Sequence, residues 1–263
     1  MRHLKNVVKE DQLMDKHTIS VKEFYDILRW SDIDVGSAWG EELDRRIDFL
    51  LKKTQPNKEL PVLDMGCGNG RYSVALAKLG YQVVGVDFDE KSINDARRFA
   101  LLQNADVSFI CADINEADLK LGFGLAFSVQ FFQHLRDNQR DICLQRIYEL
   151  LVSDGKLFVE MPYQKCSIDG DSGQDEWNGY VQLYKGRYNP ETKENVSEIV
   201  FIRKVDGAER KVITRSRVYD PLEIEELLKK ENFKKMSIYG DWDGRDIDND
   251  CCRIIFVAQK GQD

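Results

Sequence analysis

Residues 62–71 read Val-Leu-Asp-Met-Gly-Cys-Gly-Asn-Gly-Arg, and this stretch decides the fold. A short apolar run, typical of a buried strand, leads into three glycines, which let the backbone turn tightly and approach a ligand closely. The helix that follows presents its N-terminus at the same turn. Several cofactor-binding folds use such a turn, so by itself it indicates a cofactor site of unspecified kind.

Two features of this glycine loop narrow the choice of cofactor. Dinucleotide-binding turns place a third glycine or alanine where this chain has Arg71. Asp64 ends the strand two residues before Gly66, and a carboxylate there repels a pyrophosphate but attracts an ammonium or sulfonium group. The loop therefore predicts a cofactor with cationic character, and a nicotinamide-dependent oxidoreductase is disfavoured.

Strands and helices alternate on both sides of the loop. Short apolar runs predict strands over 60–65, 82–87, 107–110, 125–129 and 156–161, with helical stripes between most of them. This alternation predicts βαβ units and a parallel sheet. The strands lack strict polar alternation, as expected for a sheet covered by helices on both faces.

The pattern changes after the last of these strands. The polar stretch 166–176 predicts a loop, and 180–188, 196–205 and 210–219 predict three antiparallel strands. A further helix from Asp220-Pro221 and two strands, 235–239 and 253–258, close the chain. We expect four segments: an N-terminal helical cap over 1–58, a cofactor-binding core over 59–165, an antiparallel β lid insertion over 166–219, and a C-terminal helix with closing strands of the core over 220–263.

Further acidic residues follow the second and third predicted strands. Asp87 ends the second strand, where a carboxylate can accept hydrogen bonds from ribose hydroxyls, and Phe88 can pack on a purine. Asp113 follows the third strand, within reach of an exocyclic adenine amine. The carboxyl ends of parallel strands meet at one edge, so these acids and Asp64 point to one crevice. The alternative is that each aspartate is a helix cap or turn residue.

Asp64, the three glycines, Asp87 and then Asp113-Ile114 follow one another in order, and residues 60–161 resemble the core of class I S-adenosylmethionine-dependent methyltransferases. The resemblance implies a doubly wound, Rossmann-like, mostly parallel seven-stranded α/β sheet with an antiparallel seventh strand. The implied cofactor is S-adenosylmethionine.

The resemblance also implies roles for individual residues. The loop of Gly66, Cys67, Gly68 and Gly70 holds the methionine moiety, Asp87 holds the ribose, Asp113 and Ile114 face the adenine, and Gln130 closes over the methionyl end. Tyr25, in the N-terminal cap, is expected to fold over the cofactor as the leading helices do in similar small-molecule enzymes. Ordinary helix packing is the alternative for Tyr25.

Methyl transfer from a sulfonium is an in-line displacement, which needs geometry more than acid–base chemistry. A base is required only if the acceptor arrives protonated. His134 lies just past the fourth strand, and its intrinsic pKa suits proton removal; a backbone-bonded residue at a helix start is the alternative. Enzymes that modify planar amino groups of nucleic acids carry Asn/Asp-Pro-Pro-aromatic after this strand. This chain has Ser128-Val-Gln-Phe-Phe, which disfavours that class.

Composition excludes further classes. The 263 residues include 38 basic and 46 acidic side chains, a net charge of −8, which argues against gripping a phosphate backbone. No apolar run is long enough for a membrane span and the N-terminus has no secretory signal, so we expect a cytoplasmic protein. The six cysteines form no CxxC pair, and the aspartates of 241–250 lack the calcium-loop order, so no metal is expected.

The sequence thus predicts an S-adenosylmethionine-dependent methyltransferase that transfers a methyl group to an N or O atom of a small molecule. If the aspartate-rich loop of 241–250 faces the crevice, it favours a cationic substrate such as an amine. Two alternatives stay open: a methyltransferase acting on RNA or a protein side chain, and a non-catalytic nucleotide-binding module. The acceptor and the oligomeric state are not predicted.

Overall fold

The computed structural model describes residues 26, 40–120, 122–163, 172–177, 179–248, 251 and 253–261. They fall into two compact units, one within Met1–Val35 and Ser167–Arg217 and one within Gly36–Cys166 and Val218–Asp263. We call these the insertion unit and the core unit. The predictions made for residues 1–39, Tyr25 included, lie outside the described residues except at residue 26. The boundaries of the four predicted segments stay predictions.

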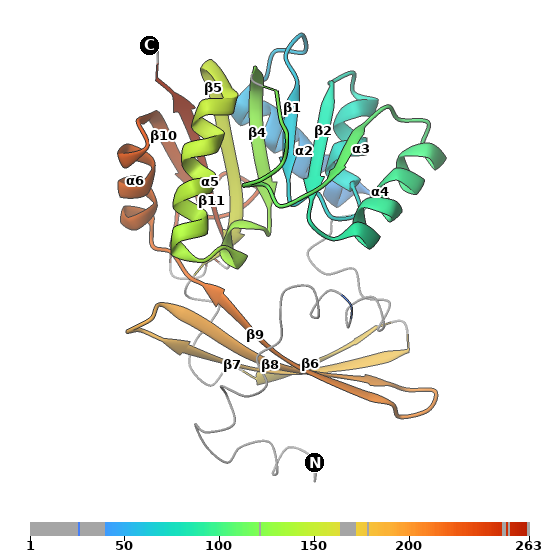
Figure 1. Cartoon of the computed structure of the whole chain (residues 1–263). Helices are drawn as coiled ribbons and strands as arrows, with labels where there is room; N and C mark the ends of the chain where they lie inside the picture. The colour runs from blue at the N-terminus through green and yellow to red at the C-terminus, as the bar shows by residue number, and fades with distance from the viewer. Residues whose placement is uncertain are drawn as a thin grey trace. The chain divides into compact units, whose positions relative to one another are not determined.

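The core unit is built on a seven-stranded sheet, in the order β10-β11-β5-β4-β1-β2-β3 (Figure 1). The strands are β1 (Val62–Met65), β2 (Val83–Asp87), β3 (Ser108–Cys111), β4 (Phe123–Val129), β5 (Leu151–Pro162), β10 (Phe233–Tyr239) and β11 (Arg253–Lys260). β11 runs antiparallel to both β5 and β10, and the other neighbouring strands pair in parallel. The predicted fold class is confirmed.

Helices cover both faces of this sheet. They are α2 (Glu41–Thr54), α3 (Arg71–Lys78), α4 (Glu90–Leu102), α5 (Asp137–Leu150) and α6 (Pro221–Lys230), with a short 3-10 helix, η2 (Phe132–His134), after β4. α2 and α3 pack on one face through a core that includes Leu50, Phe127 and Phe158. α5 and α6 pack on the other through a core that includes Leu144 and Phe256. Figure 1 shows α5 in front of the sheet and α2 behind it.

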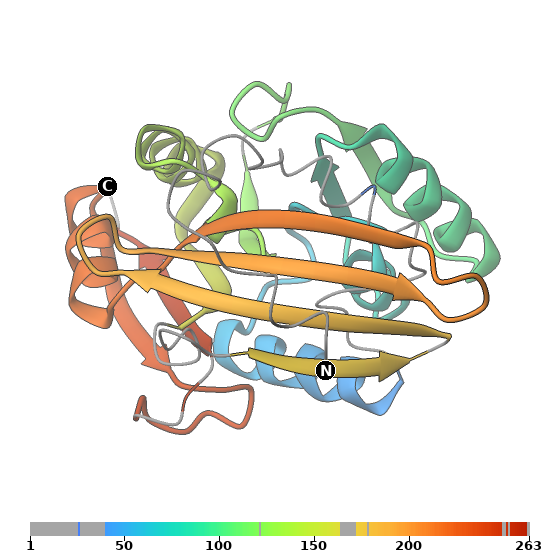
Figure 2. The ribbon, with the colours of Figure 1, turned by 90° about the horizontal axis from the view of Figure 1, so that it is seen from below.

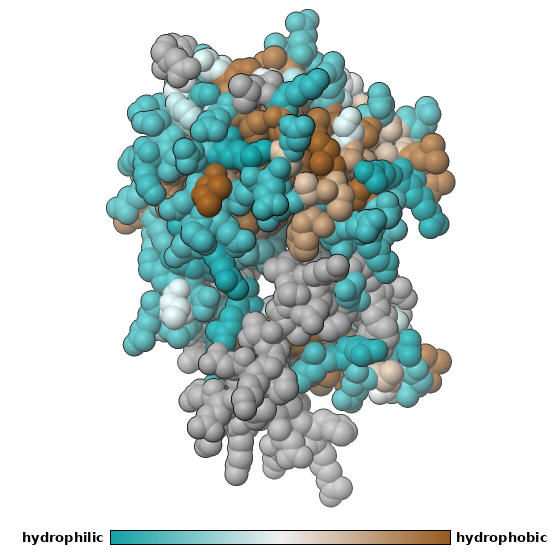
Figure 3. Space-filling model, in the orientation of Figure 1, coloured by the Kyte–Doolittle hydropathy of each residue, from teal (hydrophilic) through white to brown (hydrophobic). Residues whose placement is uncertain are grey.

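Local sequence accounts for where these helices begin and how they pack. The Asp220 carboxylate accepts a 2.8 Å hydrogen bond from the Glu223 N–H and Pro221 follows it, so the predicted start of α6 is confirmed. In α2 the buried Leu43, Ile47 and Leu50 recur at helical spacing. No helix among the described residues is long and apolar enough to cross a membrane. On the face shown in Figure 3, hydrophilic side chains cover most of the core unit.

The insertion unit is a four-stranded antiparallel sheet in the order β6-β7-β8-β9, seen broadside in Figure 2. Its strands are β6 (Ser172–Trp177), β7 (Tyr180–Asn189), β8 (Glu194–Arg203) and β9 (Glu209–Arg217). The prediction of a loop over 166–176 is therefore wrong for residues 172–176, which pair with β7. β6 is an edge strand with one pairing partner, so it forms without the apolar pattern that marks a buried strand.

Candidate functional site

The three glycines of the loop after β1 all have left-handed backbone angles, with φ of +69° at Gly66, +52° at Gly68 and +78° at Gly70. A Cβ on Gly66 would lie 2.6 Å from the Phe131 ring, and one on Gly70 would lie 2.7 Å from the Phe109 ring. Among the residues that the structure describes, a Cβ on Gly68 would meet nothing within 4 Å. Packing thus requires the outer two glycines, while the middle of the loop is open to a ligand.

Asp64 lies beneath this loop at the end of β1. Its side chain is buried, at 3% exposure, and its Oδ2 accepts a 2.6 Å hydrogen bond from the Ser73 hydroxyl. Burial raises the pKa of Asp64 to about 7; the nearby charge of Asp87 adds to this effect, and the Ser73 hydrogen bond opposes it. A carboxyl group with this pKa ionises readily once a cation is placed beside it.

Asp87 ties the glycine loop to the end of β2. Its Oδ2 accepts a 2.9 Å hydrogen bond from the Gly68 N–H, and its Oδ1 accepts one of 2.9 Å from the Asp89 N–H. The next side chain, Phe88, is 43% exposed. The structure thus brings Asp64, Asp87 and the glycine loop together, as predicted from strand order. The ribose role of Asp87 and the purine contact of Phe88 stay predictions.

The other residues assigned from the resemblance occupy three different settings. The Cys67 sulfur lies 3.0 Å from where a Gly85 Cβ would stand, and burial raises the pKa of its thiol well above the usual value. Asp113 is exposed, and its Oδ1 accepts a 2.9 Å hydrogen bond from the Asn115 N–H. Ile114 is 4% exposed and packs in the core on the α5 side. The adenine role of Asp113 and Ile114 stays a prediction.

Gln130 follows β4 and lies beside the glycine loop, because the adjacent Phe131 packs against Gly66. Its backbone is left-handed, with φ of +58°. Its N–H donates to the Glu160 carbonyl at 3.0 Å, and its Nε2 lies 3.0 and 2.8 Å from the two oxygens of the Glu160 carboxylate. The assignment of Gln130 to the methionyl end stays a prediction.

His134 is the last residue of η2, and its Nε2 lies 3.5 Å from the Gln133 Nε2. Burial lowers the pKa of His134 to about 4. The imidazole is therefore neutral at pH 7 and only a weak base. Its role as a general base stays a prediction.

Sequence reasoning missed two buried charged side chains in this region. Glu160 in β5 is 1% exposed, and its sequence context indicated only a strand. Arg71, the first residue of α3, is 2% exposed, and burial lowers its pKa to about 9. A cation at a helix N-terminus opposes the helix dipole, which makes Arg71 a candidate partner for an anionic group of a ligand. Its position directly after the last glycine was the available signal.

In the described part of the aspartate-rich loop between β10 and β11, arginine side chains lie close to two of the carboxylates. Asp241 lies 3.2 Å from Arg245 and 3.3 Å from Arg253, and Asp243 lies 4.0 Å from Arg245. These two carboxylates are therefore neutralised by neighbouring cations, which weakens the argument that the loop attracts an amine.

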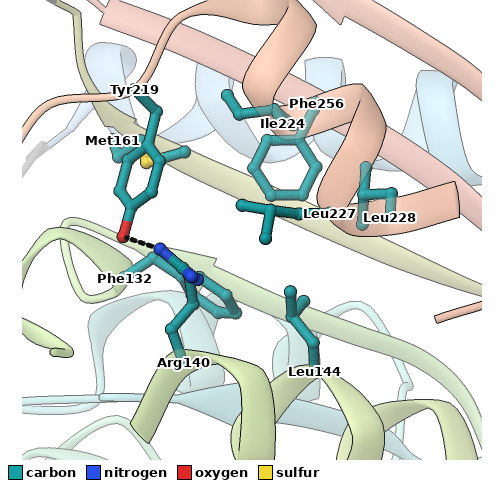
Figure 4. A pocket seen from close by; sticks show the side chains of 9 residues that line it. All are labelled: Phe132, Arg140, Leu144, Met161, Tyr219, Ile224, Leu227, Leu228 and Phe256. Atoms are coloured by element: carbon teal, nitrogen blue, oxygen red, sulfur yellow. Dashed lines mark hydrogen bonds between the residues drawn. The ribbon is translucent and has the colours of Figure 1, made fainter. Parts of the chain in front are cut away.

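A pocket lies on the opposite side of the sheet, between α5, α6 and strands β5 and β11 (Figure 4). Its lining is mostly apolar, and Arg140 donates a 3.2 Å hydrogen bond to the Tyr219 hydroxyl at its rim. The Arg140 guanidinium also pairs with Asp141 at 2.7 Å. None of the residues assigned above to the cofactor or to catalysis lines this pocket.

Comparisons with known proteins agree with this geometry. Residues 62–155 match the sequence profile of a family described as "Methyltransferase domain". A putative methyltransferase of Geobacillus sp. (strain WCH70) is 28% identical over 211 residues, which cover 76% of this chain and 84% of the relative. The ubiquinone biosynthesis O-methyltransferase of Coxiella burnetii is 37% identical over 99 residues, 37% of this chain and 41% of the relative.

A solved structure extends the likeness to most of the chain. The amino pentose methyltransferase CalS10 from Micromonospora echinaspora, with S-adenosylmethionine bound, superposes with a TM-score of 0.68 and 17% identity. The match covers 93% of this chain and 99% of CalS10. At this identity the likeness shows a shared fold.

The residues around the glycine loop suit S-adenosylmethionine as the cofactor. The open space at Gly68 admits a ligand against the backbone, and the carboxyl groups of Asp64 and Asp87 suit positively charged and hydroxyl groups. The buried Arg71 suits a carboxylate. Residues 62–155 therefore match a methyltransferase domain, and the chain shares the fold of the S-adenosylmethionine-bound methyltransferase CalS10.

Proposed function

We propose that this enzyme transfers a methyl group to a nitrogen or oxygen atom of a small molecule by in-line displacement. The observation that carries the cofactor half of the proposal is the open space at Gly68, flanked by Asp64 and Asp87. When bound, S-adenosylmethionine supplies an electrophilic methyl group on a positively charged sulfur. In this proposal the protein contributes mainly position and electrostatics.

The chain's own groups support these two contributions. The Asp64 carboxyl has a pKa of about 7, so a nearby cation shifts it to the charged form that attracts the cation. The Asp87 carboxylate fixes the Gly68 N–H and thereby the open part of the loop. His134 stays the proposed general base: burial lowers its pKa to about 4, so its imidazole is neutral and has a nitrogen lone pair that can accept a proton from the acceptor.

The acceptor is proposed to be a small molecule, and an amine is its first candidate class. CalS10, which shares the fold, is an amino pentose methyltransferase. The ubiquinone biosynthesis enzyme, similar over the cofactor-binding part, is an O-methyltransferase, so oxygen stays in the proposal. The net charge of −8 favours a small-molecule acceptor, whether an amine or a hydroxyl compound, over a nucleic-acid substrate.

The experiment proceeds in two stages. Calorimetry first compares the binding of S-adenosylhomocysteine with that of NAD. The enzyme is then incubated with methyl-labelled S-adenosylmethionine and, in separate reactions, with amino sugars, small hydroxyl compounds, total RNA and a protein mixture. We expect S-adenosylhomocysteine to bind and NAD not to bind. The label should then appear in a small-molecule fraction, as an N-methyl group when the acceptor is an amino sugar.

Label in the RNA or protein reaction would overturn the small-molecule proposal while leaving the methyltransferase intact. Binding of S-adenosylhomocysteine with no transfer to any acceptor would favour the non-catalytic module instead.

A further inference from the structure

Gln130 has a backbone conformation that glutamine rarely adopts. Its φ of +58° places it in the left-handed region, and it lies between the end of β4 and the start of η2. A residue other than glycine keeps such a conformation only when its surroundings determine it, and residues of this kind cluster at ligand sites. The contacts that hold Gln130 in this conformation therefore bear on the site.

Glu160 holds Gln130 through both its backbone and its side chain. The Glu160 carbonyl accepts from the Gln130 N–H at 3.0 Å, and the carboxylate oxygens lie 3.0 and 2.8 Å from the Gln130 Nε2. The Gln130 Oε1 in turn accepts a 3.1 Å hydrogen bond from the Gln133 Nε2. The Gln130 side-chain amide is thus held at both of its atoms: the Glu160 carboxylate binds its nitrogen, and Gln133 of η2 donates to its oxygen.

The Glu160 carboxylate is itself fixed in place. It is 1% exposed, and burial raises its pKa, whereas the Gln130 hydrogen bonds and the charges of Arg253, whose Nη1 lies 3.7 Å from the Glu160 Oε1, and Arg46 favour the ionised form. Arg253 extends the arrangement to the β10–β11 loop, because its Nε lies 3.3 Å from the Asp241 Oδ1. A buried carboxylate is costly, and an apolar side chain in its place is often neutral or stabilising. Stability therefore gives little reason for an acid at this position.

We propose that Glu160 is a positioning residue of the methyl-transfer site, whose carboxylate fixes the Gln130 amide and the left-handed turn after β4. Through that turn it also sets the position of Phe131, whose ring packs against Gly66 of the cofactor loop. The inference rests on the proposed function in one respect, since Gln130 is assigned to the cofactor's methionyl end by resemblance. Glu160 acts through Gln130 and touches no reacting atom.

The test compares Glu160→Gln, Glu160→Met, Gln130→Gly and the double variant Glu160→Met/Gln130→Gly with the parent. Glu59→Gln, an exposed charge removal in the same unit, is the control. Each protein is measured for S-adenosylhomocysteine affinity by calorimetry and for thermal unfolding without ligand. Neither readout needs a known acceptor.

We expect Glu160→Met to lose at least tenfold in affinity and Glu160→Gln to lose less, because glutamine keeps one acceptor oxygen for the Gln130 amide. The double variant should bind no worse than Gln130→Gly alone. In unfolding, Gln130→Gly should lower the Tm more in the parent than in the Glu160→Met background, because only in the parent does the change leave a buried carboxylate without its amide donor.

Additive effects of the two sites on the Tm would overturn the proposal, even if the parent failed to bind S-adenosylhomocysteine and so overturned the proposed function. If the parent binds, unchanged affinity in Glu160→Met would also overturn it. A comparable loss of affinity in the Glu59→Gln control would show that the change reports net charge rather than position, and the proposal would fall in that case too.

Discussion

Asp64 is an acid whose ionisation the folded chain opposes. Burial is the largest cause of its pKa of about 7, against an ordinary value of 3.8, and the charge of Asp87 acts in the same direction. A carboxyl group whose pKa is raised by folding stabilises the protein fully below its unfolded pKa, and this contribution is lost as the pH rises through the folded pKa. The contribution of Asp64 to the free energy of unfolding of the ligand-free enzyme should therefore fall as the pH rises from about 4 to about 8.

We expect Asp64→Asn to stabilise the ligand-free protein and to weaken its binding of S-adenosylmethionine. At pH 8 the ligand-free variant should be more stable than the parent by about 1 kcal/mol or more, because no charge is buried, and this advantage should shrink at pH 5. The affinity for S-adenosylmethionine at pH 8 should fall at least tenfold. Urea unfolding at both pH values and calorimetry measure the two effects.

The matched control for Asp64→Asn is Asp48→Asn, an exposed acid on α2. Removing this exposed charge should leave the affinity unchanged. A stability difference between Asp64→Asn and the parent that is the same at pH 5 and pH 8 would contradict the assignment of a raised pKa to Asp64.

At the scale of the element, the loop between β1 and α3 uses chemically identical residues for two purposes. Gly66 and Gly70 are required by the Phe131 and Phe109 rings, whereas Gly68 faces open space. All three have left-handed backbones, so each costs strain when replaced by alanine. Only at Gly68 does the added methyl group project where a ligand would bind.

We expect Gly66→Ala and Gly68→Ala to fail in different ways. Gly66→Ala should destabilise the protein by about 2–4 kcal/mol, through backbone strain and collision with the Phe131 ring. Gly68→Ala should cost only about 1–2 kcal/mol but weaken S-adenosylhomocysteine binding more than tenfold at a temperature where it is folded. Gly179→Ala, with φ of +84° in the insertion unit and nothing near its Cβ, is the control for strain alone. Equal affinity in Gly68→Ala and the parent would contradict the open-loop assignment.

The elements also show why sequence predicts some features and not others. The glycine loop, Asp64 and Asp87 were predictable because strand order places consecutive strand ends at one edge of a parallel sheet. Glu160 was not, because the carboxylate is explained only by Gln130 and Arg253, which the fold brings together from the turn after β4 and from β11. β6 was missed because pairing on one side, not apolar residues, makes it a strand. His134 was assigned an ordinary pKa, and only its burial shows that the value is lowered.

At the scale of the whole molecule, the chain leaves and re-enters the core unit at neighbouring points. Tyr163, just after β5, forms an isolated parallel bridge with Tyr219, just before α6. The segment Ser167–Arg217 therefore begins and ends near two points that the core unit itself holds together. The described residues assigned to the cofactor all belong to the core unit, with its own hydrophobic cores on both sheet faces.

We expect replacement of residues 167–217 by a short Gly/Ser linker to separate cofactor binding from acceptor methylation. The bridge between Tyr163 and Tyr219 keeps the ends close, so the linker closes a short loop at little entropic cost. S-adenosylhomocysteine affinity should stay within about threefold of the parent, because the glycine loop, Asp64 and Asp87 keep their partners, each of which lies in the core unit. Methylation of the acceptor identified with the full chain should fall at least a hundredfold, as expected if the insertion supplies the acceptor site. Loss of cofactor binding in a variant that still unfolds cooperatively would show instead that the insertion unit belongs to the cofactor site, while undiminished methylation would place acceptor recognition in the rest of the chain.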